Sequence, residues 1–253
     1  MQGDRTPRPS LSLAVVLAIS SALVGGLAFA QGGPPLVTED PGTPGAGRWE
    51  INIAGEGEEL DGDRWIAAPV LDLNYGLGDR IQLKLEVPWA VSDPRVGSTR
   101  SGLGLWELGV KWRFLDRGEE GLRVSVYPQV ELPVPGTDET LVGDGSSLSL
   151  PVQAAQVFGK VEMSAEAGYL VVEGEEDGWF AGVAVGLAAR PKLELVAEMY
   201  ASWVAGAGHE LTGFNAGIAF DLGDRLALLA SAGRALTGEG PDLTAYLGVQ
   251  ILR

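Results

Sequence analysis

Residues 65–89, WIAAPVLDLNYGLGDRIQLKLEVPW, contain two runs of alternating apolar and polar side chains joined by a short glycine-rich link. In the second run the apolar set is Ile81, Leu83, Leu85, Val87 and Trp89, with polar or small residues between most of them. A period of two indicates a β-strand, because successive side chains leave opposite faces of the pleat. The link at 76–79 holds residues that tolerate positive φ. The stretch therefore predicts an antiparallel hairpin with one almost wholly apolar face.

The same alternation recurs along the rest of the chain and predicts about twelve strands. They begin at Arg48, occupy both arms of 65–89, and continue at 106–114, 122–132, 148–158, 161–171, 179–187, 193–203, 212–222, 226–236 and 242–252. The links after the even-numbered strands are short. The links after the odd-numbered strands are longer and more polar, and the longest is expected between strands five and six. This alternation of link lengths is typical of outer-membrane barrels, which have short periplasmic turns and an even number of strands.

Aromatic side chains are expected at both ends of the apolar band. Given that topology, the outer ends of the strands carry Trp65, Trp89, Tyr169, Trp179, Trp203 and Phe214. The periplasmic ends carry Trp49, Tyr75, Trp112, Phe114, Phe158 and Phe220. Two aromatic girdles are expected at the two membrane interfaces. The predicted fold is all-β, a closed antiparallel transmembrane β-barrel. The alternative is a secreted soluble β-sandwich or β-solenoid, whose strands also show alternating apolar and polar residues.

The first thirty residues have the pattern of a secretory signal peptide. An apolar run, LSLAVVLAISSALVGGLAFA, ends in a small-x-small site at 28–30. We expect residues 1–30 to be removed, although a membrane anchor is the alternative. Residues 31–47 are too rich in glycine and proline for a regular element, so we expect a periplasmic leader or a segment tucked into the barrel mouth. The predicted barrel is then 48–253.

Charge and cysteine content exclude several classes of protein. Without residues 1–30 the chain holds 16 basic and 33 acidic residues, a net charge of −17, so a nucleic-acid partner is not expected. The absence of cysteine excludes disulfides, thiolate metal sites and an N-terminal lipid anchor on cysteine. We expect no cofactor and no metal site.

The charged residues of the strands are expected to face the lumen, because an Arg or Lys facing lipid at mid-membrane costs ~2–4 kcal/mol. The candidate lumen-lining residues are Lys84, Glu86, Glu107, Lys111, Arg113, Arg123, Glu131, Glu162, Glu166, Glu194 and Glu198. Cations lie mainly on strands three to five, and strands seven and nine offer only acids. Two hypotheses follow: a transverse field that orients polar solutes in a narrow pore, or a charge network that fills and closes the barrel.

An enzymatic role is not expected. Barrel phospholipases need a histidine beside a serine, and the single histidine here, His209, lies in a predicted loop without a serine at the i+2 position.

Four short motifs resemble a family of bacterial outer-membrane barrels named for the MetA (meta-cleavage) pathway of phenol degradation. They are TEDPGT at 38–43, GRWE at 47–50, NYGL at 74–77 and DR at 79–80. The resemblance implies a barrel that moves small hydrophobic or aromatic molecules across the outer membrane, and it brings no catalytic residues.

The sequence as a whole predicts a passive outer-membrane pore for small molecules. Its expected partners are outer-membrane lipid, a small-molecule solute and the barrel-assembly machinery. The alternative is a structural barrel with a plugged lumen and no transport.

Overall fold

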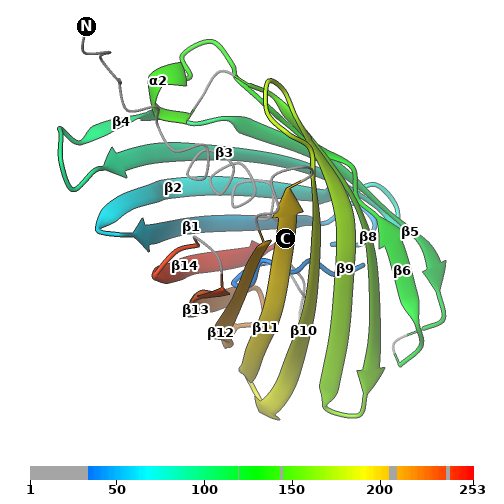
Figure 1. The fold of residues 1–253 in the computed structure, drawn as a ribbon. Helices are drawn as coiled ribbons and strands as arrows, with labels where there is room; N and C mark the ends of the chain where they lie inside the picture. Colours follow the sequence, from blue (N-terminus) through cyan, green and yellow to red (C-terminus); the bar gives the residue numbers. More distant parts are fainter. Residues whose placement is uncertain (1–33, 119, 143–144, 205–209, 238–239) are drawn as a thin grey trace, which may run out of the picture.

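The strands close on themselves in a single antiparallel ring (Figure 1). The computed structural model describes residues 34–118, 120–142, 145–204, 210–237 and 240–253. The elements are β1 (Trp49–Leu60), β2 (Asp63–Gly76), β3 (Ile81–Asp93), β4 (Arg100–Leu103), β5 (Trp106–Asp116), β6 (Arg123–Val126), β7 (Gln129–Leu132), α2 (Glu139–Val142), β8 (Ser147–Phe158), β9 (Val161–Val172), β10 (Gly178–Arg190), β11 (Leu193–Val204), β12 (Glu210–Gly223), β13 (Leu226–Thr237) and β14 (Leu243–Leu252). The predicted signal peptide and His209 lie outside the described residues.

Twelve strands form the ring within the described part of the chain, as the sequence predicts. β6 and β7 pair with the same neighbours, β5 and β8, so they are two halves of one strand. Pro128 lies between the two halves, and a proline has no N–H to give to the ladder. β4 pairs with Trp89–Ser92 of β3, next to the part of β3 that pairs with β5, so β4 and β5 are two parts of one strand interrupted at 104–105.

The ring closes where the first and last strands meet. β1 pairs with β14 from Glu50–Leu252 to Glu59–Leu243. The closure runs to the end of the chain, because Trp49 and Arg253 exchange both backbone hydrogen bonds, at 2.6 and 2.8 Å. A closed ring has no free edge, which is the condition for a sheet to stand in lipid. The described residues contain no helix long and apolar enough to cross a membrane.

The outside of the ring is apolar and the inside is polar. Val110, Val152, Val183 and Leu247 are each about half exposed, and polar side chains at alternate positions are buried. Aromatic rings meet at both ends of the strands: Trp49 with Tyr75 at 4.8 Å between centroids, and Tyr169 with Trp179 at 4.6 Å. This is the exterior of a bacterial outer-membrane barrel.

One predicted aromatic position is wrong. Trp65 lies near the end of β2 at which the sequence places it, but it faces the interior and does not join the girdle, because β2 contains a bulge between Ala67 and Val70. The extra residue reverses the alternation, so residues before the bulge point the opposite way from residues after it. Ala67 has the same parity as Trp65 and is completely buried.

The link lengths follow the prediction with one exception. The turns at 77–80, 117–122, 159–160, 191–192 and 224–225 lie at one end of the barrel, here called the turn rim, and 133–146 is the longest link at the other end, the loop rim. The exception is the link between β1 and β2. It is only Asp61–Gly62, because both strands extend further than the alternation indicates. The link between β3 and β5 contains β4, which begins at Arg100.

Candidate functional site

The segment of residues 34–47 lies inside the barrel and occupies the lumen. Figure 1 shows this blue part of the chain within the ring of strands. Leu36, Thr38, Glu39 and Asp40 are almost fully buried. A glycine- and proline-rich segment makes no ladder of its own, so its backbone donors need partners on the barrel wall. The segment, called the plug below, finds those partners in carboxylates of the wall.

Two glutamates of the wall hold the plug backbone. Glu198 on β11 accepts hydrogen bonds from the N–H groups of Val37 at 2.8 Å and Thr38 at 2.6 Å. Glu166 on β9 accepts one from the N–H of Glu39 at 3.0 Å. Side-chain amides orient both carboxylates: Asn215 donates to Glu198, and Gln153 donates to Glu166. Hydrogen bonds to a charged acceptor are the stronger kind, so these contacts fix the middle of the plug.

Lys111 on β5 holds the plug from the opposite wall. Its Nζ lies 2.8 Å from the Glu39 carboxylate and donates to the Asp40 carbonyl at 2.7 Å. The ammonium also lies 4.5 Å from the centre of the Tyr127 ring, within cation–π range. Burial raises the pKa of Glu39 well above its ordinary value, and the charge of Lys111 opposes that rise.

A glycine on β10 provides the space in which the plug lies against the wall. A Cβ placed on Gly182 would lie 3.1 Å from the Cβ of Thr38 and would collide with the threonine hydroxyl. As long as Thr38 is present, a larger residue at Gly182 is therefore incompatible with the seated plug.

The plug leaves the lumen at the turn rim, beside the β2–β3 turn. The Thr43 hydroxyl donates to the Asp79 carbonyl at 3.0 Å, and the N–H of Ala46 donates to the Asp79 carboxylate at 3.2 Å. Arg113 donates to the same carbonyl at 2.6 Å. These contacts lead the chain directly into β1.

The other charged candidates form short-range pairs. Lys84 lies 2.9 Å from Glu86 and 2.8 Å from Glu107, and Arg123 lies 2.7 Å from Glu162. Glu131 accepts a hydrogen bond from Ser147 at 2.6 Å. Glu194, on β11, is half-buried. Each cation thus has an acid within ion-pair distance, including Arg113 with Asp116 at 3.1 Å.

Sequence reasoning missed the polar partners that are not charged strand residues. Asn74 donates to Asp72 at 2.9 Å, and Gln82 donates to Asn74 at 2.7 Å and to the Tyr127 hydroxyl at 3.3 Å. The alternation of the sequence already places these residues on the inward face, because they share the parity of Lys84 and its neighbours. The carboxylate of Glu39 was missed because the plug has no periodicity that assigns its side chains to a face. Within the described ranges, no group of three or more His, Asp or Glu residues is placed to hold a metal ion.

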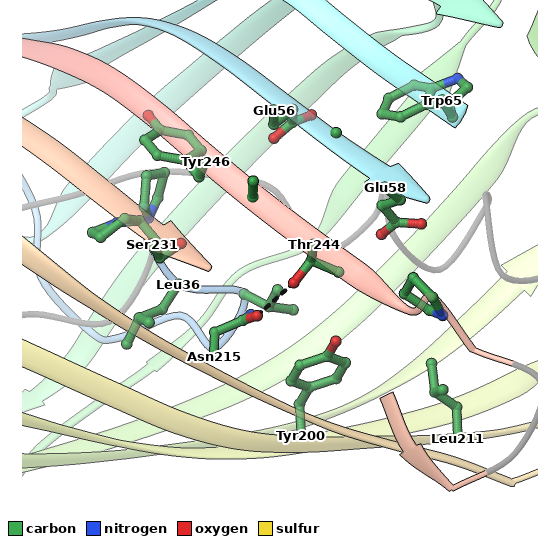
Figure 2. Close-up of a pocket in the computed structure, with 16 residues that line it drawn as sticks. Leu36, Glu56, Glu58, Trp65, Tyr200, Leu211, Asn215, Ser231, Thr244 and Tyr246 are labelled. Atoms are coloured by element: carbon green, nitrogen blue, oxygen red, sulfur yellow. Dashed lines mark hydrogen bonds between the residues drawn. The ribbon is translucent and has the colours of Figure 1, made fainter. Parts of the chain in front are cut away.

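A cavity of about 70 Å³ lies between the plug and the loop rim. It is bounded below by Pro34, Pro35 and Leu36, and its walls come from β1, β2, β11, β12, β13 and β14. Figure 2 shows Glu56 and Glu58 on one side of it and Tyr200 on the other, with the hydrogen bond from Thr244 to Asn215 between them.

The fold is similar to solved outer-membrane channels and porins. The COG4313 outer membrane channel from Pseudomonas putida F1 aligns with a TM-score of 0.70 at 14% identity, over 90% of this chain and 100% of that chain. The KdgM porin aligns with a TM-score of 0.59 at 10% identity, over 80% of this chain and 98% of that one. The NanC porin aligns with a TM-score of 0.59 at 6% identity, over 79% and 98%. At sequence identities of 6–14%, the similarity to these proteins shows the fold alone.

A comparison with curated proteins found no match. A family model does match, over residues 72–253, and its description is "Putative MetA-pathway of phenol degradation". This range covers most of the barrel, from the middle of β2 to the C-terminus. The chain therefore belongs to the outer-membrane barrel family that carries this description.

Proposed function

We propose that the protein is an outer-membrane channel for small molecules, and that the plug closes it in the conformation described here. The observation that carries the proposal is a segment inside a closed ring, held by wall carboxylates and one lysine rather than by strand pairing. The backbone of residues 34–46 is bound to wall side chains and is not paired with a strand, so this part of the plug can leave without breaking the barrel. Passage then requires displacement of part of residues 34–47.

The comparisons support a channel of small solutes in general terms. Three of the similar folds are named as a channel or porins, and one KdgM porin structure is named as a complex with disordered oligogalacturonate. The family description points instead toward aromatic compounds, and we propose small hydrophobic or aromatic molecules as the solutes of this chain. No chemical step is proposed, and the protein acts passively.

A disulfide lock tests the role of the plug. The chain has no cysteine, so Thr38→Cys with Gly182→Cys creates a single pair. The two Cβ positions are 3.1 Å apart, a few tenths of an ångström below the ~3.5–4.5 Å of natural disulfides, so the plug shifts slightly when the bond forms. Liposome swelling with graded solutes should fall to the protein-free level when the pair is oxidised and return on reduction. Thr38→Cys alone is the control and should not respond to oxidation.

A deletion separates a channel from a structural barrel. We expect removal of residues 34–46 to admit larger solutes at faster rates, because the lumen then holds only wall side chains. Faster gel migration before boiling shows whether this variant is folded. If it is folded and admits no solute, the protein is a closed structural barrel and the channel proposal is wrong.

A further inference from the structure

Glu39 of the plug connects two parts of the barrel wall through the two ends of a single residue. Its carboxylate lies 2.8 Å from the Lys111 ammonium on β5, and its backbone N–H donates to the Glu166 carboxylate on β9 at 3.0 Å. Thr38, Glu39 and Asp40 are all almost fully buried, so this contact lies within the plug and away from its ends. Lys111 and Glu166, called the Glu39 seat below, therefore hold a carboxylate and an N–H donor at a fixed separation.

The Glu39 seat contains one positive and one negative charge. Among the described residues, Lys111 forms an ion pair with Glu39 and with no other acid, and both hydrogen bonds of its ammonium go to the plug. Glu166 accepts one hydrogen bond from Gln153 and one from the plug. When the plug leaves, each wall charge loses contacts of the charge-assisted kind, which are the stronger hydrogen bonds. A molecule that restores contacts to both charges should therefore bind in the vacated seat.

The plug satisfies the polar atoms around the seat incompletely. The Oε1 atom of Glu39 has no hydrogen-bond partner within the described ranges, although the residue is almost fully buried. Gln82 lies opposite Lys111 in the β3–β5 register and is completely buried, and its amide oxygen likewise has no partner there. Buried polar atoms normally have a partner. A small molecule that is not tied to the backbone of the plug can turn to pair more of these atoms than Glu39 does.

We propose that the Glu39 seat binds small zwitterionic amino acids, with the carboxylate at Lys111 and the ammonium at Glu166. The spacing follows from Glu39 itself, in which three carbon atoms separate the backbone nitrogen from the side-chain carboxyl carbon, as in 4-aminobutyrate. A zwitterion matches both charges of the seat, whereas a simple anion or cation leaves one of them unpaired. The inference rests on the proposed function, because the plug must leave the seat, and it names a polar class of solute for the channel.

Three probes of similar length test the charge pattern. 4-Aminobutyrate, butyrate and butylammonium are titrated by ligand-observed NMR into the purified full-length Gly182→Val variant in a non-ionic detergent at pH 7. In this variant the valine collides with Thr38 and displaces the plug. 4-Aminobutyrate should bind at least about tenfold more tightly than either other probe, because each of those lacks one charged hydrogen bond. If butyrate or butylammonium binds as tightly, or if 4-aminobutyrate does not bind, the proposal is wrong.

Substitutions in the seat should each remove one half of this preference. In the Gly182→Val background, Lys111→Met should lower the affinity for 4-aminobutyrate to that for butylammonium, and Glu166→Gln should lower it to that for butyrate. Lys160→Met and Glu175→Gln remove the same charges from exposed links and are the controls. Equal weakening by the controls would show a general effect of charge and overturn the site. Faster gel migration before boiling verifies that each variant is folded.

The disulfide lock assigns the binding to the seat and separates it from transport. When Thr38→Cys and Gly182→Cys are oxidised, Glu39 stays in its seat, so 4-aminobutyrate should not bind. Binding to the locked protein would place the site elsewhere and overturn the proposal. A Gly182→Val barrel that binds 4-aminobutyrate with the expected preference but does not swell faster disproves the channel and keeps the seat. A barrel that swells faster but does not bind disproves the seat alone.

Discussion

At the scale of single residues, Lys111 is the point where the barrel wall and the plug depend on each other. It is the cation nearest to Glu39, and it is completely buried. Removing one partner of a buried ion pair leaves the other charged and desolvated, at a cost of ~3–5 kcal/mol. Loss of Lys111 should destabilise the seated position of the plug more than the folded barrel, because Glu39 can leave the lumen and return to water.

Lys111→Met should therefore raise permeability. We expect several-fold faster liposome swelling by small solutes, with the barrel still heat-modifiable on a gel. Lys160→Met removes a charge from an exposed turn and is the matched control. Unchanged swelling in the Lys111 variant would contradict an anchoring role for this side chain.

The pH dependence of that variant has a definite sign. Burial raises the pKa of Glu39 in the seated plug above its ordinary value of 4.5, and the variant lacks the ammonium that opposes the rise. The seated form then holds a proton that the released form gives up, so lowering the pH favours the seated form. We expect the extra swelling to be smaller at pH 5 than at pH 8, and the opposite order would disprove the assignment to Glu39.

At the scale of elements, the bulge in β2 decides which residues enter the lumen. It turns Ala67 and Trp65 inward, while Leu71 and Leu73 keep the parity expected from the sequence. One additional residue thus changes which side chains of the loop-rim half of β2 face the lumen and leaves the turn-rim half of β2 unchanged.

Deletion of Ile66 should turn Trp65 toward lipid, because it moves the tryptophan by one position on the strand while the bulge stays in place. We expect stronger quenching of tryptophan fluorescence by brominated lipids, because Trp65 would then contact acyl chains. The same comparison in a Trp65→Phe background isolates this residue from the other tryptophans. If the deletion raises quenching equally in both backgrounds, Trp65 has not moved.

The contact between β10 and the plug gives a second prediction at this scale. Gly182→Val should displace the plug by collision with Thr38 and increase swelling several-fold. Adding Thr38→Gly to that variant should reduce the effect, because it removes the group that collides. Two effects that simply add would show that Gly182 and Thr38 do not interact.

At the scale of the whole molecule, closure of the ring is the condition for stability in lipid. β1 and β14 pair along nearly their full length, and the last residue takes part. An unpaired edge in the hydrocarbon region costs several kcal/mol for each unsatisfied backbone group.

Removal of residues 249–253 should therefore abolish the folded form. We expect the truncated chain to migrate identically on a gel with and without boiling, whereas the complete chain runs faster when it is not boiled. A truncated chain that keeps its heat-modifiable band would show that the β1–β14 closure is dispensable.

The sequence by itself determined the twelve-strand barrel, because each strand carries a period of two that assigns one face to lipid and the other to the interior. It also indicated the buried charges, since Lys84, Lys111 and Glu198 share the inward parity of their strands. Only the tertiary structure decided where residues 34–47 lie and that Trp65 faces inward. A glycine- and proline-rich segment has no periodicity that fixes its partners, and the parity of a bulged strand depends on its pairing with β1 and β3 rather than on its own residues.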